Sequence, residues 1–409
     1  MGLERIQAVL AALGHPERAC RWVHVAGTNG KGSTCAMIES ALRASGLRTG
    51  LYTSPHLEEP TERIQIAGKQ VSRELFLSAF QNVHQTAERL LASGVIDSHP
   101  TYFETVTAMA FVLFRDAGVE TGVIEVGLGG RLDATNVITP VLSVITPIDF
   151  DHEAWLGSSL AAIAGEKAGI IKPGVPVVIA PQRPEAWEVL SARRATVIPV
   201  SLWLASDLDL HRLGCRFTAV KDDARIAIDC PLAGAHQINN ALTAVAALHH
   251  LQVPTEAITE GIRQVRWPGR LELVSRYPDI ILDGAHNPAG VAALAAHIQR
   301  FYKDRKVWLV YATMRDKSVD EISESLSPQV DEVILTAADS ARSLRPEVMR
   351  ELFPHPRVRV AARLSGALDI LREASPGDAI FITGSLFLVG EARSLLRRPA
   401  GPVPAKETP

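Results

Sequence analysis

The sequence predicts an α/β protein in two parts: a mostly parallel sheet domain of the P-loop type, followed by a smaller Rossmann-like α/β domain. Three observations lead to this fold class. Short apolar runs rich in Val, Ile and Leu alternate with segments of helical spacing, which is typical of a parallel sheet covered on both faces. A glycine-rich turn that contains a lysine follows the first apolar run. A second alternating series begins near residue 280, shortly after a Pro-Gly pair.

In the first half of the chain, each apolar run is interpreted as a buried strand because Val, Ile and Leu dominate it. The predicted strands are 22–26, 47–53, 122–126, 141–146 and 175–179. The predicted helices between them are 33–44, 104–115 and 159–168. This alternation indicates an open α/β sheet.

The second half repeats the alternation. Its predicted strands are 280–282, 307–311, 332–335, 358–361 and 379–383, and its predicted helices are 289–301, 318–326, 346–353, 364–374 and 386–395. Pro268-Gly269 punctuates the pattern, so the segment 267–270 is the predicted hinge. We therefore expect one domain over 1–268, a second over 269–396, and a disordered Pro-rich tail over 397–409.

Composition and charge exclude several classes of protein. Of 409 residues, 47% are hydrophobic and 21% are charged, which is typical of globular domains. The 42 Lys and Arg against 45 Asp and Glu leave a net charge of -3, so we expect neither nucleic acid nor a membrane as a partner. Four cysteines are too few for a disulfide framework, and the chain has neither a signal-peptide start nor an apolar run of membrane-spanning length. These features predict a cytoplasmic protein.

The turn Gly27-Thr28-Asn29-Gly30-Lys31-Gly32-Ser33-Thr34 is the strongest local signal for chemistry. It connects a predicted strand to a predicted helix, where backbone N–H groups and the helix dipole can hold a phosphate. Lys31 can reach the terminal phosphates, and Ser33 can ligate Mg²⁺. The spacing differs from the common G-x-x-x-x-G-K-[ST] pattern. The alternative is a glycine-rich turn with no ligand.

Oxygen-rich side chains follow two other predicted strands. Glu125 ends one apolar strand, and Asp149, Asp151 and His152 follow another. Ligands of open α/β folds bind at these carboxyl ends, and such a donor set suits Mg²⁺. Alternatively, Glu125 is a paired structural acid and His152 a surface histidine. Lys167 lies at the C-terminal end of a predicted helix, where the positive charge of a lysine commonly interacts favourably with the helix dipole.

Two further groups of polar residues have either a structural or a functional explanation. In the second domain, Asp283 and His286 follow a predicted strand, while Asn287 and Pro288 form an ordinary helix start. The segment 234–241 places a His-Gln-x-x-Asn cluster before an Ala/Leu-rich helix, and helix capping explains only one of its asparagines.

In their order along nearly the whole chain, these motifs resemble the dihydrofolate synthase/folylpolyglutamate synthase family of the Mur ligase superfamily. The matching segments are 2–6, 27–33, 53–57, 62–64, 102–104, 125–136, 151–152, 165–169, 269–270 and 283–288. In that family a short segment before Gly2-Leu3-Glu4-Arg5 helps form the pterin pocket. This chain begins almost at that point, so we expect an alternative start, a truncation or a shortened pocket.

The resemblance implies a set of functional residues. It implies ATP binding by Thr28, Asn29, Gly30, Lys31, Gly32, Ser33, Asn240, Arg270, Asp283 and His286. It implies two Mg²⁺ ions near Ser33, Ser54, Glu125, His152 and Lys167, the lysine being carbamylated by CO₂, with a monovalent cation such as K⁺ as a further cofactor. It implies a pterin side formed by Phe103, Leu132, Asp133 and Ala134. The implied catalytic residues are Lys31, Lys167, His152 and Arg270, with Arg270 acting when the second domain closes.

The implied activity is ATP-dependent amide ligation by a monomer. L-glutamate would be joined to dihydropteroate, giving dihydrofolate, and to folates, giving polyglutamates, through an acyl phosphate. Retention of Asp133 within Leu-Asp-Ala-Thr-Asn favours the enzyme that uses both acceptors. One alternative is another Mur-type amino-acid ligase, acting on a peptidoglycan or cyanophycin precursor. A second is a P-loop NTPase that acts as a switch.

Overall fold

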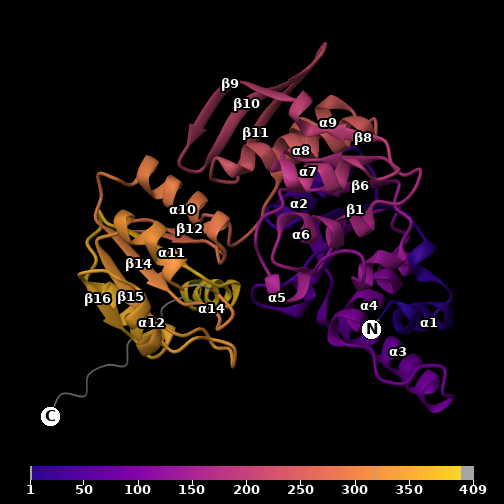
Figure 1. Cartoon of the computed structure of the whole chain (residues 1–409), viewed down its shortest axis with the longest axis horizontal. Helices are drawn as coiled ribbons and strands as arrows, with labels where there is room; N and C mark the ends of the chain where they lie inside the picture. Colours follow the sequence, from indigo (N-terminus) through magenta and orange to yellow (C-terminus); the bar gives the residue numbers. More distant parts are fainter. Residues whose placement is uncertain (1, 318, 398–409) are drawn as a thin grey trace. The chain divides into compact units, whose positions relative to one another are not determined.

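The structure is a computed structural model that describes residues 2–317 and 319–397 (Figure 1). The chain forms two compact units, one ending at Trp267 and the other beginning at Pro268. Of the predicted tail, Arg397 is the last residue of a helix, and residues 398–409 lie outside the described part. The first residue of the predicted helix 318–326 also lies outside it. Among the described helices, none has both the length and the apolar character that a membrane crossing requires.

An eight-stranded sheet forms the centre of the first unit, in the order β4-β3-β2-β5-β1-β6-β7-β8. The strands from β2 to β8 in this order are parallel, whereas β3 and β4 are antiparallel to their neighbours. All five strands predicted for this half of the chain are present, which confirms the parallel α/β sheet. The strands are β1 Arg21–Ala26, β2 Thr49–Tyr52, β3 Ile64–Ile66, β4 Lys69–Gln70, β5 Thr121–Glu125, β6 Leu142–Ile145, β7 Val177–Ile179 and β8 Val197–Pro199.

Helices cover both faces of this sheet because successive strand side chains point to opposite faces. Trp22 of β1 packs in the core formed with α1, α3 and α4, whereas Val23 packs in the core formed with α2, α8 and α9. Further along the sheet, α6 and α7 pack with β7. The helices of this unit are α1 Glu4–Ala12, α2 Lys31–Ala44, α3 Arg73–Ala92, α4 Tyr102–Asp116, α5 Glu153–Leu156, α6 Leu160–Lys167, α7 Pro184–Ser191, α8 His236–His250 and α9 Thr255–Gln264.

A three-stranded antiparallel sheet, which the sequence analysis did not predict, lies beside α8 and α9 (Figure 1). Its strands are β9 Leu204–His211, β10 Gly214–Lys221 and β11 Ala224–Cys230. Phe217, Ala219, Ile226 and Ile228 are buried and contribute to the same core as α2 and α8. Their alternation with more exposed residues is the period of two that marks a strand with one buried face.

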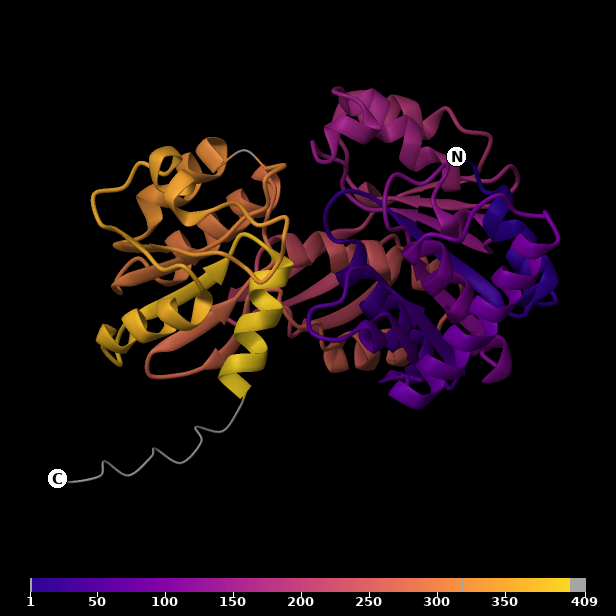
Figure 2. The same cartoon turned by 90° about the horizontal axis from the view of Figure 1, so that it is seen from below.

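The second unit has a six-stranded sheet in the order β12-β13-β17-β14-β15-β16, in which only β12 is antiparallel to its neighbour. This confirms the smaller α/β fold. The strands are β12 Glu272–Ser275, β13 Asp279–Leu282, β14 Val307–Tyr311, β15 Glu332–Leu335, β16 Val358–Val360 and β17 Ala379–Thr383. The helices are α10 Pro288–Phe301, α11 Val319–Leu326, α12 Pro346–Leu352, α13 Leu364–Ile370 and α14 Leu386–Arg397. Figure 2 shows α14, in yellow, against this sheet, where it contacts β13 and β17.

Candidate active site

The predicted functional residues of the first unit lie in the loops that follow β1, β2, β5 and β6, with others in the first turn of α2 and on α4, α6 and α8. β1 lies between β5 and β6 in the sheet, and the chain passes from β1 to β2 on one side before it reaches β6 on the other. Such a reversal of strand order leaves a crevice at the carboxyl ends of the strands, where open α/β sheets bind ligands. The topology therefore places the loop containing Lys31 at a typical binding edge.

The loop after β1 is held in place by backbone and side-chain hydrogen bonds. Thr28 N donates to the Pro147 carbonyl over 2.9 Å, and Thr28 Oγ1 donates to the Asp149 carbonyl over 3.0 Å. Lys31 begins α2, and its Nζ donates to the Thr28 carbonyl over 3.0 Å. The loop is thus connected to the segment after β6, and it leads directly into the N-terminus of a 14-residue helix, which is suited to binding an anion.

Gly30 is required by the geometry of this loop. Its φ is +84°, and a Cβ at this position would lie 2.2 Å from Asn240 Oδ1. Asn240 Nδ2 donates to Gln237 Oε1 over 2.9 Å, and Gln237 Nε2 lies 3.4 Å from Ser33 Oγ. Two buried amides of α8 therefore brace the loop and the first turn of α2.

Glu125 and Ser54 are brought together at the ends of β5 and β2. Ser54 N donates to Glu125 Oε2 over 3.0 Å, and the glutamate side chain is buried. His152 is exposed and precedes α5 with a φ of +54°, and its N–H donates to Asp151 Oδ1 over 2.9 Å. The structure thus joins two of the predicted metal ligands directly and places the histidine on a strained turn after β6.

Lys167 is buried at the end of α6, and its Nζ donates to the Gly27 carbonyl over 2.7 Å. Its ammonium group therefore points to the loop after β1. Burial lowers the pKa of Lys167 to about 7, and the nearby charge of Lys31 acts in the same direction, while Asp151 and Asp133 oppose it. At neutral pH a large share of this amine is unprotonated, which is the form that can react with CO₂.

Asp133 holds the loop after β5 in shape. Its Oδ2 accepts N–H bonds from Gly127 and Leu128 over 3.0 and 2.9 Å, and its Oδ1 accepts from Thr135 N and Oγ1 over 3.0 and 2.5 Å. Burial raises the pKa of this carboxyl group, and these hydrogen bonds oppose the increase.

The other predicted pterin-side residues surround the Asp133 loop. The ring of Phe103 on α4 packs against Gly127, where a Cβ would lie 2.5 Å from the ring. Ala134 is buried. Leu132 is 48% exposed, so its large apolar side chain faces outward.

The three residues predicted in the second unit also converge. Asp283 Oδ2 accepts from Leu271 N over 2.9 Å and its Oδ1 accepts from Ala285 N over 3.0 Å, so the carboxylate joins the start of β12 to the end of β13. A Cβ on Gly284 would lie 2.3 Å from Arg270 Nη1. His286 Nδ1 lies 2.7 Å from the Gly284 carbonyl oxygen. Asn287 caps α10 with Pro288 at its first position, which confirms the predicted helix start.

The sequence matches two Mur ligase families: the Mur ligase middle domain over residues 25–248, and the Mur ligase glutamate ligase domain over residues 269–386. A dihydrofolate synthase/folylpolyglutamate synthase of Mycobacterium tuberculosis is 36% identical, in a match covering 97% of this chain and 90% of that protein. The chain belongs to the dihydrofolate synthase/folylpolyglutamate synthase family of Mur ligases. It is an ATP-dependent ligase.

A solved structure and a longer relative also match this Mur ligase over nearly its whole length. The crystal structure of Mycobacterium tuberculosis folylpolyglutamate synthase complexed with ADP and AMPPCP has a TM-score of 0.91 at 37% identity, covering 97% of this chain and 96% of that one. A probable bifunctional folylpolyglutamate synthase/dihydropteroate synthase of Haloferax volcanii is 37% identical over 98% of this chain. The present chain spans about half of that longer relative, 49% of its length.

Two residues of this Mur ligase were absent from the predicted site. Gln237 belongs to the His-Gln-x-x-Asn cluster, which was its only signal in the sequence. His24 lies inside β1, fully buried, with Nε2 2.8 Å from Thr135 Oγ1. Because the Thr135 hydroxyl donates to Asp133, it accepts from His24 Nε2–H. Burial lowers the pKa of His24 to about 3, so the imidazole is neutral and supports the Asp133 loop through Thr135.

The lowered pKa of Lys167 predicts a pH-dependent stability for this ligase in CO₂-free buffer. From pH 7 to 10.5 the unfolded chain keeps a proton on Lys167 that the folded chain has lost. The free energy of unfolding should therefore rise with pH in this window, by up to about 1.4 kcal/mol per pH unit from this group. Below the window both states are protonated, and the full penalty of burying the charge remains. Lys167→Met should lack this increase in urea denaturation measured at a series of pH values, and parallel curves for the two proteins would contradict the assignment.

Proposed function

We propose that this ligase joins the amino group of L-glutamate to the carboxylate of dihydropteroate, giving dihydrofolate, and to the γ-carboxylate of folates, giving polyglutamates. One observation carries the proposal: the buried Lys167 amine lies 2.7 Å from the carbonyl of Gly27, at the start of the loop that leads through Lys31 into α2. A lysine of perturbed pKa at a phosphate-binding loop is a combination that indicates catalysis.

The reaction requires an activated acid. The negative charge of a carboxylate repels the lone pair of an attacking amine, and oxide cannot act as a leaving group. The acceptor carboxylate oxygen attacks the γ-phosphorus of ATP, forming an acyl phosphate and releasing ADP. The glutamate amine then attacks the acyl carbon, the C–O bond breaks, inorganic phosphate leaves, and the amine proton passes to solvent or a nearby base. The products are one amide, ADP and phosphate.

The protein's own groups stabilise the transferred phosphoryl group by charge. Lys31 exchanges its bond to the Thr28 carbonyl for the terminal phosphates, and the N–H groups of Gly30, Gly32 and Ser33 surround the phosphate oxygens. Thr28, Asn29 and Asn240 keep the loop in shape. In the second unit Arg270, Asp283 and His286 bind the nucleotide, with the guanidinium of Arg270 adding positive charge.

The residues present fit Mg²⁺ once Lys167 is modified. As an ammonium group beside Lys31, Lys167 would repel a metal ion, whereas its carbamate would add an anionic oxygen donor to those of Glu125, Ser54 and Ser33 and the imidazole of His152. Hard oxygen donors of this kind suit Mg²⁺, which also takes ligands from phosphate. When bound, two Mg²⁺ ions would neutralise charge on the phosphates. The monovalent cation stays a prediction.

The pterin is proposed to bind beside the loop after β5. Leu132 offers exposed apolar surface, Phe103 forms an aromatic wall against Gly127, and Ala134 leaves room near Asp133. Asp133 acts here through the shape of the loop, because its four hydrogen bonds are made to backbone and side-chain groups of that loop. The monomeric state, the cytoplasmic location and the lack of a nucleic-acid partner stay predictions.

The test is to incubate the protein with ATP, Mg²⁺, dihydropteroate and L-glutamate and to measure dihydrofolate, ADP and phosphate. We expect equal amounts of the three products, and ADP release that stops when either acceptor or glutamate is omitted. Tetrahydrofolate in place of dihydropteroate tests chain extension. ADP release that ignores both organic substrates would instead indicate an NTPase, and release that requires a peptidoglycan or cyanophycin precursor would indicate a different ligase.

A further inference from the structure

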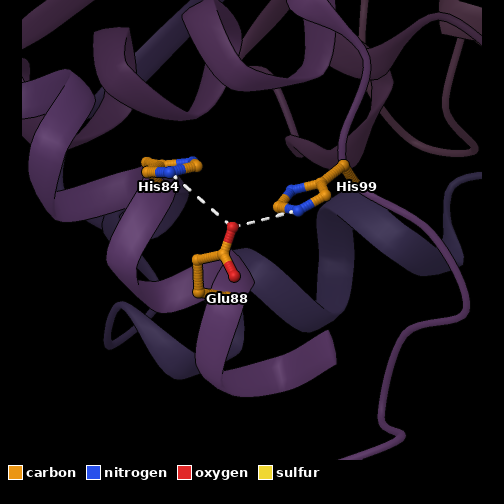
Figure 3. A group of neighbouring side chains, drawn as sticks. All are labelled: His84, Glu88 and His99. Atoms are coloured by element: carbon orange, nitrogen blue, oxygen red, sulfur yellow. Dashed lines mark ion pairs between the residues drawn. The ribbon is translucent and has the colours of Figure 1, made fainter. Parts of the chain in front are cut away.

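Three side chains of metal-ligating types meet on the surface of the first unit, and none of them belongs to the candidate active site. His84 and Glu88 lie one turn apart on α3, and His99 comes from the connection 93–101 between α3 and α4. Glu88 Oε1 lies 3.0 Å from His99 Nε2 and 3.7 Å from His84 Nε2. Figure 3 shows the carboxylate between the two imidazole rings. These three residues are called the α3 histidine cluster below.

The spacing of the donor atoms matches that of a small metal site. Zinc takes imidazole nitrogen at about 2.0–2.1 Å and carboxylate oxygen at about 2.0–2.2 Å, so two donors of one tetrahedral ion lie roughly 3.3–3.5 Å apart. The two measured separations lie on either side of this value, and all three donor atoms lie within 4.8 Å of one another. An ion could therefore enter with small side-chain rotations.

The cluster is held in position by its surroundings. The ring of His84 stacks on Phe80 at 5.5 Å, with an angle of 7° between the planes, and on His99 at 5.8 Å. The connection that carries His99 is fixed near both ends: Val95 N donates to the Leu90 carbonyl over 2.9 Å, and Arg5 Nη1 donates to Ser98 Oγ over 2.7 Å. The donors are thus largely preorganised, which lowers the entropy cost of binding a metal ion.

We propose that the α3 histidine cluster binds one divalent transition-metal ion of the Zn²⁺ class, with water completing the coordination. Two imidazoles and one carboxylate are a typical zinc donor set, whereas Mg²⁺ prefers oxygen alone. With neutral imidazoles the cluster carries one negative charge, which favours a cation. The bound ion fastens α3 to the connection that leads into α4, the helix whose second residue is Phe103.

The test uses the full-length protein, stripped of metal with a chelator and then kept in excess Mg²⁺ so that the active-site donors are occupied. Zn²⁺ is titrated by calorimetry, and Co²⁺ is added separately to record the visible absorption of a tetrahedral site. We expect one equivalent of Zn²⁺ to bind and the melting temperature to rise. Glu88→Gln and His99→Ala should each weaken binding by at least about 100-fold, the upper range for losing an outer-shell partner, and should remove the Co²⁺ bands.

The matched control is His15→Asn. His15 is another surface histidine paired with a glutamate, its Nδ1 lying 2.9 Å from Glu17 Oε1, and asparagine tolerates its φ of +56°. This variant should bind Zn²⁺ like the unmodified protein. Absence of Zn²⁺ binding to the unmodified protein would overturn the proposal. So would undiminished binding to both cluster variants, with circular dichroism confirming that they are folded.

Discussion

Lys167→Ala should lower glutamate-dependent ADP formation by at least about 10³-fold, the lower range for losing a group that stabilises charge in phosphoryl transfer. The buried amine contacts Gly27 and has a pKa of about 7, and the carbamate proposed for it would supply an anion beside the loop after β1. Short carboxylic acids such as acetate should restore part of the activity, because they can place a carboxylate in the space left by the side chain. Initial rates at saturating ATP, with and without the acid, give the measurement.

Lys172→Ala is the matched control for this prediction. Lys172 also has a pKa lowered by burial, and its Nζ lies 3.3 Å from the Asn136 carbonyl, yet it is not among the residues proposed to act on ATP. This variant should keep most of the activity. Full activity in Lys167→Ala would show that the lysine has only a structural role, in which its charge interacts with the dipole of α6. Circular dichroism separates a lost function from a lost fold.

Gly30→Ala should raise the KM for ATP at least about 10-fold and lower the free energy of unfolding by more than the ~1–2 kcal/mol that a left-handed conformation costs a residue with a Cβ. The added methyl group would lie 2.2 Å from Asn240 Oδ1, so either α8 or the phosphate loop must shift. A shift of the loop also moves Lys31 away from its place at the start of α2. Steady-state kinetics and urea denaturation measure the two effects.

Gly46→Ala separates the clash from the backbone strain. Gly46 follows the other end of α2 with a φ of +92°, and among the described residues, its two chain neighbours aside, no atom lies within 4 Å of the position its Cβ would take. This variant should lose stability through conformational strain alone and keep the KM for ATP unchanged. If the two variants bind ATP equally well, the packing of Gly30 against Asn240 has no role in nucleotide binding.

The parallel strands were the most predictable elements. Strands 307–311, 332–335 and 379–383 were predicted residue for residue, because a strand buried on both faces is a nearly continuous apolar run. The three-stranded sheet β9–β11 was missed because β10 and β11 are buried on one face only, while β9 has no fully buried residue and exposes Leu204 and Leu208. The predicted tail begins at residue 397, whereas α14 extends through Arg397, a difference of one residue.

For the site, local motifs were predictable and long-range partners were not. The glycines and lysine of the phosphate loop are adjacent in sequence, so their spacing alone indicated an anion site. Lys167 is buried because the end of α6 packs against Gly130 and its amine reaches Gly27, and neither partner is near it in sequence. The sequence alone favoured a lysine at a helix end. His24 and Gln237 reach their partners across 111 and 204 residues, respectively, and only the fold brings these groups together.

The outer strands of the eight-stranded sheet determine whether a strand of another molecule can pair with its borders. One border is the two-residue strand β4, which carries exposed Lys69, and the other is the three-residue strand β8, which ends in Pro199 and so lacks one donor. Short borders, a charged side chain and a proline each discourage a strand from another molecule from adding to the sheet. The sheet whose loops carry the proposed catalytic residues therefore has two borders that disfavour pairing with a strand of another molecule.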